Sequence, residues 1–87
     1  MYCILVYDVA SEKTGKMLKL CRKYLNWIQN SVFEGNITQI KLQELIFEAK
    51  KIMNEEVDSL IIFTTRDENW LYKQVIGKDK NPLDTIL

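Results

Sequence analysis

The chain has 87 residues, of which 47% are hydrophobic, and its basic and acidic side chains balance to zero formal net charge. This composition predicts one small globular domain, and the neutral charge excludes a global field that would attract nucleic acid or a membrane. The sequence contains no His, so His-based zinc sites, Ser-His or Cys-His nucleophile pairs and His general bases are excluded. The two cysteines, Cys3 and Cys21, form no CxxC motif, and we expect them to be buried thiols in a reduced, cytoplasmic compartment.

The first predicted element is a strand at the N-terminus. The run from Tyr2 to Tyr7 is apolar or aromatic throughout, which is typical of a central strand covered on both faces. Asp8 follows this run directly. Since ligands often bind at the rim of a sheet, beyond the carboxyl ends of its strands, we expect any chemical centre of this protein to lie at Asp8.

Helical and extended patterns alternate along the rest of the chain. Apolar residues at helical spacing predict a helix over 12–25 and a second helix, capped by Thr38, that runs to about residue 54. Between them, residues 27–37 have room for one long strand or two short strands, and Gly35-Asn36 is a turn signal. Two further strands are predicted at 58–65 and 70–76, before a turn at 77–82 and an apolar tail at 83–87.

This order, β-α-β-(β)-α-β with an additional C-terminal strand, predicts a ferredoxin-like α+β two-layer sandwich. We expect residues 1–76 to form the domain and residues 77–87 to form a tail that adds a strand to a partner. Two helices on one face leave the other face of the sheet open. Because the first strand is apolar on both faces, we expect a second copy to cover it, in a homodimer with its sheets packed face to face.

A homodimer would also double Asp8. One carboxylate holds a divalent cation poorly, whereas Mg²⁺ accepts one or two carboxylates together with water and phosphate oxygens. We therefore expect one Mg²⁺ shared by two symmetry-related Asp8 side chains, with a bound water that attacks a phosphodiester. A solvated or helix-capping carboxylate at the same position is the alternative.

Basic and acidic residues are segregated along the sequence. The first helix is rich in bases and the second helix and its exit are rich in acids, which predicts either two ordinary solvated faces or a basic surface that follows a phosphate backbone. The predicted nucleic-acid-binding residues are Lys13, Lys16, Lys19 and Lys23, and the acids are Glu44, Glu48, Glu55, Glu56 and Asp58. The aromatic residues Trp27, Phe33, Trp70 and Tyr72 are expected mainly in the core, with base stacking as the alternative.

Two short segments resemble a known family when they are taken together. Tyr-Asp-Val at 7–9 closes the first strand, and Gln-Asn-Ser-Val-Phe-Glu-Gly at 29–35 forms the second. The chain is thereby similar to the second of the two universal CRISPR adaptation proteins. The resemblance implies a ferredoxin-like homodimer that, in some members, is a metal-dependent endonuclease on RNA or DNA, with Asp8 as the metal ligand.

The resemblance also implies a partner. The small dimer would bridge two dimers of the CRISPR integrase and hold duplex DNA for spacer acquisition, with Leu83, Ile86 and Leu87 in the partner-binding tail. The positions at which nuclease-active members often carry arginines hold Gly15, Met17 and Trp27 here. A small regulatory ferredoxin-like binding module without nuclease activity is the alternative function.

Overall fold

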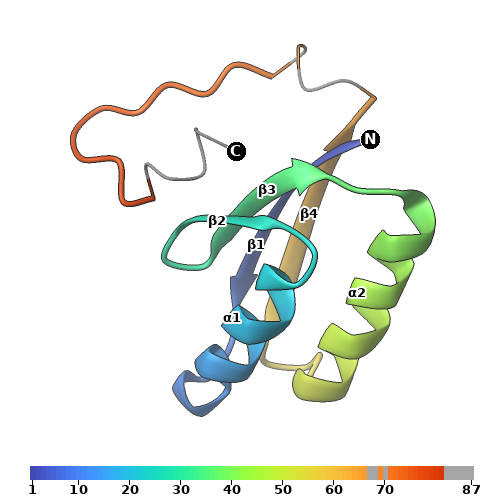
Figure 1. The fold of residues 1–87 in the computed structure, drawn as a ribbon. Helices are drawn as coiled ribbons and strands as arrows, with labels where there is room; N and C mark the ends of the chain where they lie inside the picture. Colours follow the sequence, from blue (N-terminus) through green and yellow to red (C-terminus); the bar gives the residue numbers. More distant parts are fainter. Residues whose placement is uncertain (67–68, 70, 82–87) are drawn as a thin grey trace.

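The computed structural model describes residues 1–66, 69 and 71–81. Its elements follow the chain in this order: β1 (Tyr2–Asp8), the 3₁₀ turn η1 (Ser11–Lys13), α1 (Thr14–Arg22), β2 (Asn26–Gln29), β3 (Val32–Asn36), α2 (Gln39–Ile52) and β4 (Ser59–Thr65). The strands form one antiparallel sheet of order β2-β3-β1-β4, and both helices cover the same face (Figure 1). The predicted ferredoxin-like two-layer sandwich is therefore confirmed.

The segment between the helices forms two short strands, which decides the alternative that the sequence left open. β2 and β3 are joined at Asn30, whose φ of 45° is in the left-handed region that Asn tolerates better than most residues. The prediction of a turn at Gly35-Asn36 is wrong, because both residues belong to β3. Gly35 pairs with Cys3 and Asn36 pairs with Tyr2, so pairing with the central strand keeps this segment extended.

The first helix is shorter than predicted. It begins with the 3₁₀ turn at Ser11–Lys13 and ends at Arg22 rather than at Leu25. Leu25 nevertheless enters the core, where it is 5% exposed. The second helix matches its prediction closely, since the Thr38 side chain accepts a hydrogen bond from the backbone N–H of Lys41 at 3.1 Å and so caps the helix.

The hydrophobic core lies between the sheet and the two helices. Alternate residues of β1 point toward the helices, and Cys3, Leu5 and Tyr7 are all buried. The Tyr7 ring stacks on Phe33, with ring centroids 6.1 Å apart. The helices contribute Met17, Leu20, Cys21, Leu42, Leu45 and Ala49 to the same cluster.

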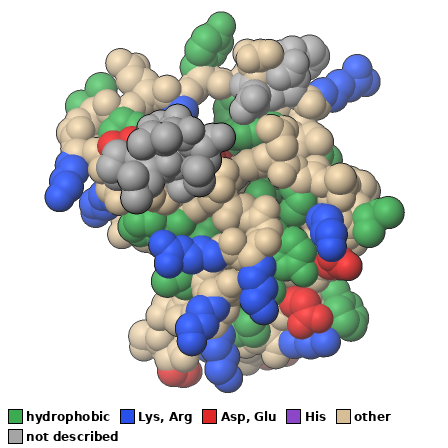
Figure 2. Space-filling model, viewed as in Figure 1, with side chains coloured by type: hydrophobic (Ala, Val, Ile, Leu, Met, Phe, Trp, Pro, Cys, Tyr) green, Lys and Arg blue, Asp and Glu red, His purple; other side chains and the backbone are tan. Residues whose placement is uncertain are grey.

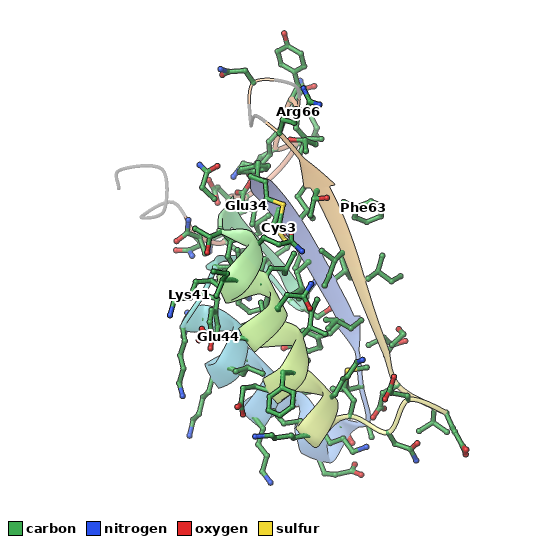
Figure 3. The ribbon with its side chains drawn as sticks, turned by 90° about the vertical axis from the view of Figure 1, so that its right-hand side faces the viewer. Cys3, Glu34, Lys41, Glu44, Phe63 and Arg66 are labelled. Carbon is green, nitrogen blue, oxygen red and sulfur yellow. The ribbon has the colours of Figure 1, made fainter. Side chains whose placement is uncertain are left out.

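The opposite face of the sheet is also apolar on its β1 and β4 strands. Ile4 lies beside Phe63 and Val6 lies beside Ile61 in the register of β1 with β4. The side chain of Phe63 points away from the helices (Figure 3), and Phe63 and Ile61 are 59% and 50% exposed. The sequence-based expectation that this face needs a cover therefore has a structural basis.

Part of that cover comes from the chain itself. Residues 71–76 lie against the β2 and β3 side of this face, where they enclose a cavity of about 420 Å³ with Ile4, Ile28 and Val32. The Lys73 ammonium lies 2.5 Å from a carboxylate oxygen of Glu34 and holds the segment to β3.

The strand predicted at 70–76 is wrong for 71–76, which have no regular secondary structure. The physical reason is that the segment lies across a sheet face rather than along an edge. Within the described residues it therefore forms no ladder of backbone hydrogen bonds with another strand.

Candidate functional site

Asp8 is the last residue of the central strand, and its side chain is exposed. In the sheet register it lies opposite Ser59, the first residue of β4. Side chains alternate along a strand, so Asp8 lies on the same face as Ile4 and Val6, away from the helices. The structure thus places the predicted acid at the end of the apolar face that a second copy would cover.

The described part of one chain does not form a complete metal site around Asp8. Among residues 1–66, 69 and 71–81, no group of three or more Asp, Glu, Cys or His side chains is arranged to hold a metal ion. A carboxylate is nonetheless the ligand type that Mg²⁺ prefers. The residues therefore fit Mg²⁺ only if a second chain, water or a substrate phosphate completes the coordination.

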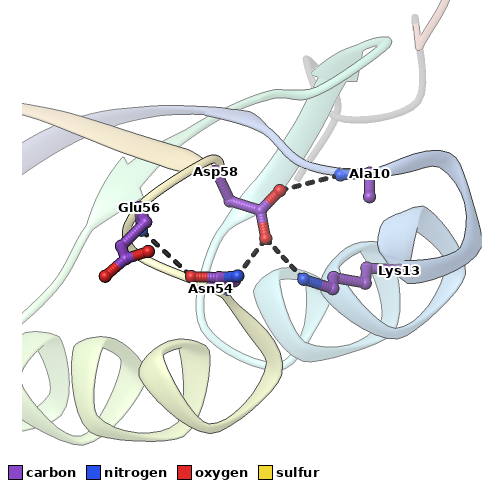
Figure 4. A network of polar contacts seen from close by, with 5 residues as sticks. All are labelled: Ala10, Lys13, Asn54, Glu56 and Asp58. Carbon is purple, nitrogen blue, oxygen red and sulfur yellow. Dashed lines mark hydrogen bonds and ion pairs between the residues drawn. The ribbon is translucent and has the colours of Figure 1, made fainter.

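The segment that follows Asp8 is held by the buried carboxylate of Asp58, which lies directly before β4. One oxygen of Asp58 accepts a hydrogen bond from the backbone N–H of Ala10 at 2.9 Å. The other accepts from the backbone N–H of Asn54 at 2.8 Å and forms an ion pair with the Lys13 ammonium at 2.7 Å (Figure 4). The turn between α2 and β4 is thereby attached to the segment between β1 and α1.

The Asp58 side chain is only 2% exposed, so its charge must be satisfied within the protein. The hydrogen bond from Lys13 is the main reason that the pKa of the Asp58 carboxyl is lowered from 3.8 to about 2, with smaller contributions from the two backbone N–H groups. Asp58 is therefore ionised throughout the physiological pH range.

This network changes the predicted charge pattern at two residues. Asp58 is wrongly grouped with the surface acids, because it is buried and paired. Lys13 is predicted from the sequence to bind nucleic acid together with the other lysines, but its ammonium forms an ion pair with Asp58. The sequence gives no local signal for this pair, since 45 residues separate its members.

The other three predicted lysines lie free on the surface of α1 and its C-terminal cap. Lys16, Lys19 and Lys23 are exposed, and within the described part of the chain none of them forms an ion pair. Basic side chains gather over the α1 region in the space-filling view (Figure 2). This surface, the α1 lysine surface, carries a local positive charge on a protein of zero net charge.

The acids of α2 behave differently from these lysines. Glu44 is paired with Lys41 at 3.1 Å and Glu48 with Lys51 at 3.2 Å, both within one turn of the helix. Figure 3 shows Lys41 and Glu44 projecting from the outer side of α2. The α2 surface is therefore locally compensated, whereas the α1 lysine surface is not.

The predicted aromatic residues fall into different environments. Phe33 is fully buried in the core, as expected. Trp27 is only half-buried, and Tyr72 is 96% exposed. Four predicted residues lie outside the described part of the chain, namely Trp70, Leu83, Ile86 and Leu87.

The fold and these surfaces define a small ferredoxin-like protein with a strand-end acid on an apolar sheet face and a basic helix beside it. A family model described as CRISPR associated protein Cas2 matches residues 1–72. The chain belongs to this family. Among the described residues, no helix has the length and apolar character needed to cross a membrane.

Named relatives and solved structures agree with this assignment. The protein named CRISPR-associated endoribonuclease Cas2 from Dictyoglomus turgidum is 46% identical over the whole of both chains. The protein of the same name from Pyrococcus furiosus is 40% identical, again over the whole of both chains. A crystal structure of Cas2 superposes with a TM-score of 0.86 at 43% identity and covers 94% of this chain and 92% of its own. The Streptococcus pyogenes Cas2 structure shares the fold, with a TM-score of 0.73 at 24% identity over 86% of this chain and 99% of its own.

Proposed function

We propose that this protein is a CRISPR adaptation subunit: a homodimer that binds duplex DNA, bridges the CRISPR integrase for spacer acquisition, and cleaves RNA or DNA phosphodiesters with Mg²⁺ held by paired Asp8 side chains. The relatives from Dictyoglomus turgidum and Pyrococcus furiosus are named endoribonucleases, which favours RNA as the cleaved strand.

The observation that carries the proposal is the position of Asp8. Its exposed carboxylate lies on the same sheet face as the exposed side chains of Ile61 and Phe63. A second copy that covers these apolar side chains about a two-fold axis brings its own Asp8 to the same face. Burial of the two side chains favours association, because apolar area removed from water stabilises by about 25 cal/mol per Å².

In this proposal Asp8 holds the metal ion, and the α1 lysine surface binds the phosphate backbone. When bound, Mg²⁺ supplies a Lewis acid and lowers the pKa of a coordinated water. Asp8 contributes the carboxylate that would hold the ion, and the hydrogen bond from Ala10 to Asp58 restrains the chain two residues beyond it. The α1 lysine surface positions the phosphate backbone without reading its sequence.

Substitution of the paired acid tests the catalytic part. We expect Asp8→Asn to abolish Mg²⁺-dependent cleavage of single-stranded RNA and to leave the dimer intact in size-exclusion chromatography, since an amide is a far weaker Mg²⁺ ligand than a carboxylate. Glu12→Gln is the matched control, because Glu12 is an exposed acid in the segment just after Asp8. Cleavage that persists in Asp8→Asn would refute the assignment.

The integrase partnership is tested separately. We expect deletion of residues 83–87 to abolish co-purification with the integrase, because an apolar extended tail can add a strand to a partner sheet. The triple substitution of Leu83, Ile86 and Leu87 by Ser should have the same effect without shortening the chain. An intact complex in either variant would exclude this tail as the contact.

The alternative is a regulatory binding module that lacks nuclease activity. It predicts that neither duplex DNA nor single-stranded RNA binds in a salt-dependent manner. A titration with duplex DNA at two salt concentrations therefore separates it from the proposed function.

A further inference from the structure

A cavity of about 360 Å³ lies beside the α1 lysine surface, on the helix side of the sheet. Its wall is formed by β1, α1 and β2 through Tyr7, Thr14, Gly15, Leu18, Arg22 and Trp27, with Asn30 at the turn after β2. Its volume is at the small end of the range for ligand sites, which is suitable for a single flat ring system.

The indole of Trp27 is held in a fixed orientation at this cavity. Its Nε1–H donates a hydrogen bond to the backbone carbonyl of Asn30 at 3.0 Å. The Arg22 guanidinium lies over the ring, 5.6 Å from its centroid. A ring that is anchored at its edge presents a preorganised face for stacking, and less conformational entropy is lost when a ligand binds.

Two polar groups at the cavity, the Tyr7 hydroxyl and the Arg22 guanidinium, form no hydrogen bond within the described residues. Tyr7 is 5% exposed, and within the described residues its hydroxyl forms no hydrogen bond. Since no buried side-chain oxygen in this part of the chain lacks a partner, the hydroxyl is accessible, and Tyr7 lines the cavity. Arg22 is exposed, and in the same part of the chain it makes no hydrogen bond or ion pair. A hydroxyl that is accessible at a cavity and a guanidinium without a hydrogen-bond partner are groups to which a polar ligand can bind.

We propose that this cavity binds one unpaired nucleobase of a single-stranded nucleic acid, which stacks on Trp27 while Arg22 moves from the ring to the adjoining phosphate. The inference rests on the proposed function and extends it, because it adds a site for a base to a surface that otherwise contacts only phosphates.

The chemistry of the cavity supports a base over other flat ligands. Every base has a π-face that stacks on an aromatic ring, and the tyrosine hydroxyl can donate to or accept from a base edge. Lys16 and Lys19 are on the same helix as Gly15 and Leu18 of the cavity wall, so the backbone of a bound strand meets positive charge next to the cavity. A duplex keeps its bases paired and stacked and cannot place one there without unstacking it.

The test compares single-stranded and duplex probes. We expect Trp27→Leu to weaken binding of a short single-stranded RNA about tenfold, which is in the range found for loss of one base–aromatic stack, and to leave binding of duplex DNA unchanged. Trp27→Phe keeps an aromatic face and should retain most of the affinity. Phe47→Leu is the matched control, because the exposed Phe47 also lies under a cation, Lys51, at 4.5 Å, but on the other helix.

The outcomes distinguish the inference from the proposed function. Equal affinity of wild type and Trp27→Leu for single-stranded RNA would overturn the inference while the proposed function stands. An equal loss on duplex and single strand would also overturn it, because a stacking site does not act on paired bases. A wild-type protein that binds neither probe would overturn both. Circular dichroism of Trp27→Leu should match that of wild type and so show that the variant is folded. Arg22→Gln, at an exposed position, should also weaken binding of the single-stranded RNA and leave binding of duplex DNA unchanged.

Discussion

The α1 lysine surface gives a quantitative prediction for duplex binding. Lys16, Lys19 and Lys23 are exposed and, in the described part of the chain, unpaired, so each is available to neutralise one phosphate. Each neutralised phosphate contributes about 0.9 to the slope of log affinity against log salt concentration. Substitution of all three lysines by Gln should therefore reduce the slope by about 2.7 for each protomer that contacts the duplex.

This reduction has a large effect over an accessible salt range. Between about 50 and 200 mM salt, wild type should therefore lose about 40 times more of its affinity than the triple variant, because the slopes differ by about 2.7. If the α1 surfaces of both protomers contact one duplex, the difference becomes about 5.4 and the factor about 2,000. The size of the change thus reports whether one or two protomers hold the DNA.

Fluorescence anisotropy of a labelled duplex, measured across this range, gives the slope directly. The matched control is Lys41→Gln with Lys51→Gln, because these lysines are paired with Glu44 and Glu48 on α2. Loss of such exposed pairs costs only about 0.3–0.5 kcal/mol each, so the control should remain folded. A slope that is the same in the triple variant and in wild type would refute the assignment of the α1 surface to phosphate binding.

Three further predictions concern the fold that positions the site. The lowered pKa of Asp58 means that its contribution to stability is fully present above about pH 4 and is lost as the pH falls toward 2. Thermal unfolding of wild type and Asp58→Asn should therefore differ most above pH 4 and converge near pH 2; a difference that stays constant across this window would contradict the mechanism. Burial raises the pKa of the Cys21 thiol to about 12, so Cys21 should react with a disulfide reagent at pH 8 only after unfolding in urea, and rapid reaction of the folded protein would count against it. Phe33→Ala removes a fully buried ring and should lower the free energy of unfolding by about 3–5 kcal/mol in urea titrations, whereas a loss below about 1 kcal/mol would mean that the core collapses around the site.

Local patterns in the sequence were sufficient to predict most of the fold. The apolar run of β1 identifies the central strand, and the apolar stripe of α2 with its Thr38 cap identifies the longer helix, because both depend on residues close together in the chain. The exposed position of Asp8 at the end of the central strand was predictable for the same reason. The catalytic and metal-binding roles assigned to Asp8 remain predictions.

Features that depend on distant partners were not predictable. Asp58 reads as one acid among several in the sequence, and only the fold brings Ala10 and Lys13 to it from 48 and 45 residues away. The strand predicted for 71–76 has β-forming residues, but a strand also needs an edge to pair with. The cavity at Trp27 is formed by three elements, and no spacing within any one of them indicates it.

The Asp58 network connects the strand end at Asp8 with the start of the helix that carries the α1 lysine surface. Its carboxylate binds the backbone at Ala10, two residues after Asp8, and the Lys13 ammonium, one residue before α1 begins. The same buried charge therefore fixes where the strand-end acid leaves the sheet and where the basic helix starts. Loss of Asp58 should disturb cleavage and nucleic-acid binding together, whereas changes at Lys16 or Lys19 should alter binding with little effect on stability. This difference arises because Asp58 acts through the backbone that carries both surfaces, while each exposed lysine acts only through its own charge.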